Sequence, residues 1–170
     1  MNNIYIVGFM GTGKTTVASF LAKKLNRGFV DMDVAIEEDQ GKSITNIFAD
    51  SGEAHFRRLE QELLRELSAK SDLVISCGGG LICNEDNLGI LKESGVVVSL
   101  SAKASTIHER TKHKIHRPLL NTKDPLAVIE RLLVARKPYY EQADYTVDTD
   151  KLDPEGVVYK IIELLKLTNG

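Results

Sequence analysis

The stretch that decides the fold is Gly8-Phe9-Met10-Gly11-Thr12-Gly13-Lys14-Thr15, near the start of a chain of 170 residues. It fits the pattern Gly-x-x-x-x-Gly-Lys-Ser/Thr. A short apolar run over residues 4–7 precedes it and predicts a buried strand, while apolar residues at helical spacing follow it from residue 14 to residue 25. The sequence therefore predicts a strand, a glycine-rich turn and a helix in direct succession.

The composition of this turn suits a phosphate group. Its glycines allow the backbone to curl so that several N–H groups point inward, and the start of the helix adds partial positive charge. Lys14 can reach the β- and γ-phosphates, and the Thr15 hydroxyl can bind Mg²⁺. A turn that carries a lysine by coincidence is the structural alternative. The pattern indicates a nucleoside triphosphate, but GTPases, motor ATPases and small-molecule kinases share it, so the reaction stays open.

Strands and helices alternate along the rest of the chain. Further strands are predicted at residues 29–31, 73–75, 96–98 and 145–147. Helices are predicted at residues 34–39, 44–48, 53–68, 85–93, 104–111 and 126–136, and a last helix begins at Asp153-Pro154. This alternation is typical of an α/β fold whose parallel sheet is covered by helices on both faces. Ligands of such sheets bind beyond the carboxyl ends of the strands, where this chain has Gly8, Asp31 and Ser76-Cys77-Gly78.

Composition excludes several classes of protein. The chain has 22 Lys and Arg against 24 Asp and Glu, a near-balance that argues against a dedicated nucleic-acid or membrane-surface binder. No apolar run approaches the roughly 18 residues of a membrane span, and the N-terminus does not resemble a signal peptide. Cys77 and Cys83 are too few for a disulfide scaffold and lack further zinc ligands, so free thiols in a reducing compartment are expected. We expect one cytoplasmic domain over residues 1–170.

Two aspartates follow the second predicted strand, in Asp31-Met32-Asp33. In an extended segment, alternation places both carboxylates on the same side. One could lie near a metal ion while the other orients an incoming hydroxyl and takes its proton. The alternative is a helix N-cap followed by a surface aspartate.

Arg57 and Glu60 are three residues apart on one face of a predicted helix. Such a pair could hold a guanidinium ready to bind a carboxylate, although a solvated salt bridge has the same spacing. Arg136 is expected at the end of a helix, before Pro138, and carries no signal by itself. Gly78-Gly79-Gly80 lets the backbone approach a ligand closely, with a flexible turn as the alternative.

A basic stretch between two helices, residues 111–118, could close over phosphates as a lid. Arg117, next to the rigid Pro118, could then supply a cation to the transition state. A solvated basic loop is the alternative. A metal site at His113 and His116 is not expected, because no third ligand is spaced to join them.

Taken together, these motifs resemble one family. Its motifs occur in order, namely residues 8–16, Asp31-Met32-Asp33, Phe56-Arg57-x-x-Glu60, Gly78-Gly79-Gly80, Arg117-Pro118-Leu119-Leu120 and Arg136-x-Pro138-x-Tyr140. The sequence resembles the shikimate kinases over essentially its whole length. The resemblance implies ATP-dependent phosphorylation of the 3-hydroxyl of shikimate to shikimate 3-phosphate, a step toward chorismate and the aromatic amino acids.

The resemblance also implies an architecture. It is a monomeric P-loop kinase with a five-stranded parallel sheet in the order 2-3-1-4-5, helices on both faces, a substrate-binding region at about residues 33–60 and a mobile lid at about residues 112–123. ATP and shikimate would be its only partners, with no nucleic acid and no membrane.

Site residues follow from the same resemblance. Shikimate would be bound by Asp33, Arg57, Gly79 and Arg136, with support from Glu60, Gly78 and Gly80. ATP would be bound by Gly11, Thr12, Gly13, Lys14, Thr15, Thr16, Arg110 and Arg117, with Pro154 beside the adenine. Mg²⁺ would be bound directly by Thr15 and through water by Asp31. Lys14 and Arg117 would stabilise charge in the transition state, while Asp33 would orient the 3-hydroxyl and accept its proton.

Two other functions remain open at this point. Another small-molecule kinase of the same fold, such as a gluconate kinase or, less plausibly, a nucleotide kinase, would share the phosphate loop. The pair Arg57 and Arg136 favours a cyclic carboxylate as acceptor instead. A regulatory nucleotide-binding module without catalysis would be expected to have lost Lys14, Asp33 or Arg117, and all three are present.

Overall fold

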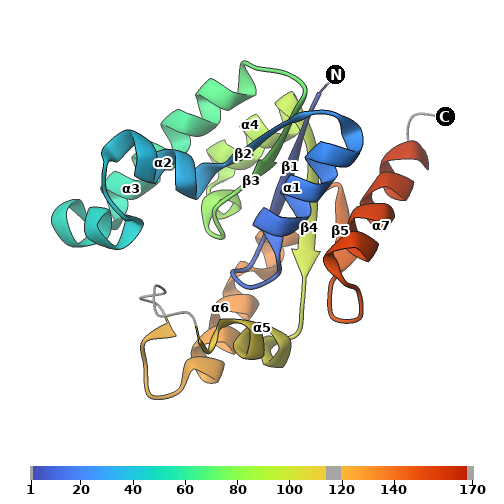
Figure 1. Cartoon of the computed structure of the whole chain (residues 1–170). Helices are drawn as coiled ribbons and strands as arrows, with labels where there is room; N and C mark the ends of the chain where they lie inside the picture. The colour runs from blue at the N-terminus through green and yellow to red at the C-terminus, as the bar shows by residue number, and fades with distance from the viewer. Residues whose placement is uncertain (1, 114–119, 168–170) are drawn as a thin grey trace.

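The computed structural model describes residues 2–113 and 120–167. Its centre is a five-stranded parallel sheet in the order β2-β3-β1-β4-β5 (Figure 1). The strands are β1 Asn3–Gly8, β2 Gly28–Asp31, β3 Leu73–Ser76, β4 Gly95–Ser101 and β5 Tyr145–Asp148. All five strands and their order were predicted from the sequence, and both predictions are confirmed.

Helices cover both faces of this sheet. They are α1 Lys14–Leu25, α2 Met32–Gln40, α3 Ile44–Ser68, α4 Glu85–Ser94, α5 Ala104–Thr111, α6 Pro125–Tyr140 and α7 Pro154–Leu167, with a short 3₁₀ turn η1 at Leu81–Cys83. Side chains of β1 alternate between two cores. Ile4 and Ile6 pack with α1 and α7, whereas Tyr5 and Val7 pack with α3 and α4. The expected three-layer α/β architecture is confirmed.

The helix α3 is broken at Gly52. Its φ of 80° and ψ of 171° are not helical, and a side chain would be strained there. The sequence predicted separate helices over residues 44–48 and 53–68, which agrees with this break. The second segment carries Arg57 and Glu60.

Two local predictions are wrong. Residues 32 and 33 are not extended, because Asp31 caps a helix that already begins at Met32. The helix α6 does not end at Arg136 before Pro138 but continues to Tyr140. Proline removes one N–H donor, and here that loss falls in the last turn, on a side of the helix where Val134 is 74% exposed and water can reach the backbone.

Other start signals are confirmed. Asp124 accepts a hydrogen bond from the Ala127 N–H ahead of Pro125, and Asp153 accepts one from the Gly156 N–H ahead of Pro154. Cys77 and Cys83 are free thiols, and burial raises the pKa of both. Within the described ranges, no helix is both long and apolar enough to cross a membrane. Arg117 and the central part of the expected lid, residues 114–119, lie outside the described residues.

Candidate active site

The phosphate loop connects β1 to α1 in a tight turn. Gly11 and Gly13 have φ values of 79° and 90°, a region that favours glycine. The Thr12 hydroxyl and N–H both donate to the Phe9 carbonyl, at 2.7 and 3.3 Å, and close the turn. Lys14 Nζ donates to the same carbonyl at 3.2 Å. The lysine therefore lies along the loop, at the start of α1, where partial positive charge accumulates.

Three strand ends meet at the first turn of α1. The Thr15 hydroxyl donates to Asp31 Oδ2 at 2.6 Å and lies 3.4 Å from the Ser76 hydroxyl. The other oxygen of Asp31 accepts the Val34 N–H at 3.2 Å. Asp31 is thus both an N-cap and a neighbour of the phosphate loop, so the two interpretations of this residue hold together.

The chemistry of this corner fits a magnesium ion. A hydroxyl and a carboxylate are hard oxygen donors of the kind that Mg²⁺ prefers. Among the residues that the structure describes, no group of three His, Cys, Asp or Glu side chains could enclose a metal ion. An ion bound here would therefore complete its shell with phosphate and water oxygens, which is the usual manner of Mg²⁺.

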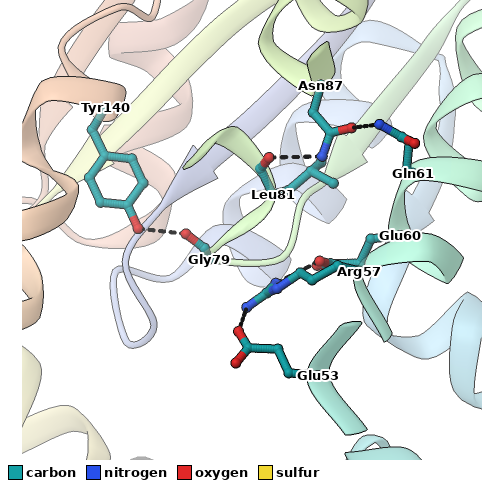
Figure 2. A network of polar contacts seen from close by, with 8 residues as sticks. All are labelled: Glu53, Arg57, Glu60, Gln61, Gly79, Leu81, Asn87 and Tyr140. Carbon is teal, nitrogen blue, oxygen red and sulfur yellow. Dashed lines mark hydrogen bonds and ion pairs between the residues drawn. The ribbon is translucent and has the colours of Figure 1, made fainter. Parts of the chain in front are cut away.

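A second cluster forms around α3. Arg57 Nη1 donates to Glu60 Oε2 at 2.6 Å, and Arg57 Nη2 donates to Glu53 Oε1 at 3.2 Å (Figure 2). The Glu60 side chain is only 2% exposed, so the solvated salt bridge that the spacing also allowed is excluded. Burial raises the pKa of Glu60 above the ordinary glutamate value, and Arg57 partly opposes this shift.

The three glycines after β3 lie among these charged groups. A Cβ at Gly78 would overlap the Glu60 carboxylate, and one at Gly80 would lie 2.8 Å from both terminal nitrogens of Arg57. A Cβ at Gly79 would lie 3.5 Å from Arg136 Nη1 and from the Gly8 carbonyl. The turn is therefore closely surrounded, which favours the ligand site over a flexible turn.

Asp33 and Arg136 complete the cluster from two other helices. Asp33 Oδ1 lies 3.2 Å from the position of a Cβ on Gly78. The Arg136 guanidinium lies over the Phe9 ring, 5.5 Å from its centre, in cation–π geometry. Asp33, Arg57, Glu60, Gly78–Gly80 and Arg136 are thus brought together next to the phosphate loop.

Arg110, on α5, contacts the phosphate loop at Gly11. Its Nη1 donates to the Gly11 carbonyl at 3.3 Å and to the Thr149 hydroxyl at 3.1 Å, and its Nη2 donates to the Thr149 carbonyl at 3.0 Å. These bonds join the phosphate loop to the segment that follows β5 and leads to Pro154. Thr16 and Pro154 are exposed at the first turns of α1 and α7.

Sequence reasoning missed several supporting side chains. Asn87 Nδ2 donates to the Leu81 carbonyl at 3.1 Å, and Asn87 Oδ1 accepts a hydrogen bond from Gln61 Nε2 at 3.2 Å (Figure 2). The Tyr140 hydroxyl donates to the Gly79 carbonyl at 2.7 Å. Thr149 and Ser76 are the others. Ser76 lies at a predicted strand end and Tyr140 belongs to the Arg136-x-Pro138-x-Tyr140 motif, so both had a usable signal, whereas Asn87, Gln61 and Thr149 have none in the local sequence.

A phosphate loop of this form, at the end of the central strand of a 2-3-1-4-5 sheet, defines a P-loop kinase fold. Residues 10–166 match the shikimate kinase family model. The chain belongs to the shikimate kinase family, as the resemblance predicted.

Individual relatives agree over the full length. The chain is 44% identical to a shikimate kinase of Thermodesulfovibrio yellowstonii, covering 100% of this chain and 99% of that relative. Among solved structures, it is similar to shikimate kinase from Acinetobacter baumannii in complex with shikimate, with a TM-score of 0.94, 40% identity and coverage of 99% and 94% of the two chains. The enzyme from Aquifex aeolicus gives a TM-score of 0.85 at 41% identity, over 96% of each chain.

A gluconokinase from Sinorhizobium meliloti is also similar in structure. It has a TM-score of 0.56 and 16% identity, over 99% of this chain and 98% of that one. At this identity the likeness reflects the shared fold alone. The comparisons therefore do not favour the gluconate kinase alternative.

Proposed function

We propose that this protein transfers the γ-phosphoryl group of ATP to the 3-hydroxyl of shikimate, giving shikimate 3-phosphate and ADP. The observation that carries the proposal is the convergence of Asp33, Arg57 and Arg136 around the glycine turn, directly beside the phosphate loop. The Acinetobacter baumannii relative, which binds shikimate, supports the same acceptor. The product would be consumed on the route to chorismate and the aromatic amino acids.

The acceptor half of the site suits a small hydroxylated ring with one carboxylate. Arg57 and Arg136 are two cations on different helices, and a carboxylate between them would be bound through charge-assisted hydrogen bonds. Glu60 orients Arg57 from a buried position. The N–H groups of Gly78–Gly80 and the Asp33 carboxylate would bind hydroxyl groups of the acceptor. Gluconate, an open-chain acid, would fit this arrangement less closely.

The donor half is the phosphate loop with its two neighbours. The N–H groups from Gly11 to Thr16 would bind the phosphates, and Arg110 and Pro154 would flank the nucleoside. Thr15 would hold Mg²⁺ directly and Asp31 through water. When bound, Mg²⁺ neutralises charge on the β- and γ-phosphate oxygens.

The chemical step is a displacement at phosphorus. The 3-hydroxyl oxygen forms a bond to the γ-phosphorus while the bond to the β,γ-bridging oxygen breaks and ADP leaves. Asp33 orients the hydroxyl and accepts its proton. Lys14 stabilises the charge that develops on the phosphate oxygens, and Arg117, from the lid, would do the same. Closure of the lid would exclude water as a competing acceptor.

We also propose a monomer that acts in the cytoplasm as a single domain over residues 1–170, with no nucleic-acid or membrane partner. The near-balance of charge supports the last part of this proposal, that nucleic acids and membranes are not partners.

Coupled ADP release tests the function directly. We expect a rate with Mg-ATP and shikimate far above the basal ATPase, no comparable rate with gluconate or a nucleoside monophosphate, and loss of the rate on addition of EDTA. Arg136→Ala should raise the KM for shikimate much more than the KM for ATP. Activity with another acceptor only would overturn the assignment of shikimate, and ATP binding without turnover would favour a nucleotide-binding module.

A further inference from the structure

Tyr140 is part of the Arg136-x-Pro138-x-Tyr140 motif but has no role in the chemistry described above. It is the last residue of α6, and its hydroxyl donates to the Gly79 carbonyl at 2.7 Å, 61 positions away in the sequence. Figure 2 shows Tyr140 approaching the glycine turn from one side, while Arg57 and Glu60 lie on the other. The hydrogen bond therefore links α6 to the glycine turn, which lies between Tyr140 and the pair Arg57 and Glu60.

This bond completes the support of the backbone at Gly79. The Gly78 carbonyl accepts the Leu81 N–H at 3.1 Å, which fixes the peptide that contains the Gly79 N–H. The Tyr140 hydroxyl fixes the next peptide, which contains the Gly79 carbonyl and the Gly80 N–H. Both peptides that flank Gly79 are thus held, although three consecutive glycines would otherwise leave them free to rotate.

The same bond lies close to Arg136. Arg136 and Tyr140 are four residues apart on α6 and therefore lie on one face of the helix. Arg136 Nη1 is 3.5 Å from the position of a Cβ on Gly79, and its guanidinium rests on Phe9. A shift of the last turn of α6 would move this cation relative to the glycine turn.

This end of α6 is packed on one side only: Tyr139 and Tyr140 pack against the core that α3 and α4 also contact. A cavity of about 250 Å³ lies beside it, bordered by Tyr140, Leu133, Phe9 and residues 99–102 of β4 and the following loop. The strand contributes small side chains there, Ser99 and Ser101, so the helix is not pressed against the sheet. The hydrogen bond from Tyr140 adds a specific polar contact between α6 and the glycine turn on this less closely packed side.

We propose that Tyr140 is a positioning residue that sets the distance between Arg136 and the Gly79 backbone, and so matches the acceptor site to the carboxylate and hydroxyl groups of one ring. The proposal rests on the proposed function, since it assigns both groups to the acceptor. Burial raises the pKa of Tyr140 to about 12, so its hydroxyl remains protonated and able to donate throughout the neutral range.

The test compares Tyr140→Phe with Tyr139→Phe. The control removes a hydroxyl from the neighbouring residue of the same helix, where no hydrogen bond of that hydroxyl occurs among the described residues. For wild type and both variants, kcat and KM are measured for ATP, for shikimate and for the shikimate analogue whose carboxylate is an amide. Calorimetry gives the Kd of shikimate, and thermal unfolding gives Tm.

In Tyr140→Phe we expect the KM and Kd for shikimate to rise roughly 3- to 10-fold, the effect of one lost hydrogen bond, with the KM for ATP unchanged. Discrimination between shikimate and its amide should fall, because Arg136 is no longer held at the proper distance. The control should match wild type. A lower Tm with unchanged shikimate constants, or equal changes for ATP and shikimate, would overturn the proposal. A wild type that does not bind shikimate would refute the proposed function itself, and this proposal with it.

Discussion

The Thr15 hydroxyl and the Asp31 carboxylate are joined by a hydrogen bond of 2.6 Å. This contact brings the start of α1 against the end of β2, so the phosphate loop and the Asp31-Met32-Asp33 segment are neighbours. The residue expected to face the metal and the residue expected to face the acceptor hydroxyl are therefore separated by a single position in the chain. Donor and acceptor halves of the site meet at the first turn of α2.

Lys14→Ala should lower turnover by about 100-fold or more, because a cation aimed at developing phosphate charge is lost. The matched control is Lys24→Ala, a lysine of the same helix whose side chain contacts Tyr159 and Glu155 on the surface. Steady-state kinetics with saturating shikimate would measure both. Near-normal turnover in Lys14→Ala would remove the lysine from the phosphate site.

Asp33→Asn should lower kcat by about 10²- to 10⁴-fold, because the amide cannot accept the hydroxyl proton. The KM for ATP should stay close to wild type, since Asp33 lies on the side of Gly78 rather than on the phosphate loop. Asp39→Asn, on the exposed face of the same helix, serves as the control. Unchanged turnover in Asp33→Asn would exclude this aspartate from the mechanism.

Gly80→Ala should mainly weaken shikimate binding, whereas Gly78→Ala should also lower the stability of the fold. An alanine Cβ at position 80 would meet the end of the Arg57 side chain, and Gly80 has an ordinary φ of −98°. Arg57 is 35% exposed and can shift slightly while it keeps its bond to Glu60, so the KM for shikimate should rise about 10-fold or more, with a smaller fall in Tm than at position 78. At position 78 the Cβ would meet the buried Glu60 carboxylate, which cannot move.

Gly78→Ala should therefore also lose stability, by about 3–5 kcal/mol if the ion pair of Glu60 is broken, which corresponds to a fall in Tm of roughly 6–20 °C. Shikimate kinetics combined with thermal unfolding of both variants checks this contrast. Equal losses of Tm would contradict it.

The raised pKa of Glu60 predicts opposite effects of pH on binding and on stability. As pH falls, Glu60 is protonated at a higher pH than an ordinary glutamate, Arg57 loses its partner, and the KM for shikimate should rise. Folding changes in the other direction. Because the folded state favours the protonated form, the contribution of Glu60 to stability is complete below the ordinary pKa and is lost as pH rises through the raised value.

Glu60→Gln separates these effects. In Glu60→Gln the KM for shikimate should already be raised at neutral pH. It should not rise further as the pH falls, whereas in wild type it should begin to rise at a pH above that at which ordinary carboxyl groups are protonated. The measurements are the KM for shikimate and the free energy of unfolding, each between about pH 4 and pH 8. If the KM for shikimate of the variant rises at low pH in the same way as that of wild type, a group other than Glu60 is being titrated.

The fold was largely predictable because its three inner strands are mostly buried and appear as short apolar runs, such as Leu73–Ser76. The two errors have local causes. Aspartate is common at helix N-caps as well as in binding sites, and here Asp31 is the N-cap of a helix that begins at Met32. Pro138 is normally a helix breaker, but its missing N–H falls in the last turn of α6, on the side of the exposed Val134, so the helix continues to Tyr140.

The candidate site, too, could be predicted only in part. Motifs of adjacent residues, such as the phosphate loop and the pair Arg57 and Glu60, could be predicted because their spacing carries the chemistry. Contacts between distant segments could not, since Arg110 with Thr149 and Gln61 with Asn87 leave no periodic trace in the sequence. The burial of Glu60 could not be predicted either, because spacing alone does not distinguish a solvated ion pair from a buried one.

The position of β1 in the middle of the sheet has a consequence for synthesis of the protein on the ribosome. Ile4 pairs with Val74 on one side and with Val96 on the other, so the strand that precedes the phosphate loop has no partner until much later residues exist. Translation at about 5–20 residues/s needs about 4 to 17 s to proceed from Thr15 to Ser101, where β4 ends. Until β3 and β4 are made, the strand has no sheet partner, and α1 is available to cover Ile4 and Ile6 long before α7 is. Molecular chaperones that bind apolar segments would meet the N-terminal strand first.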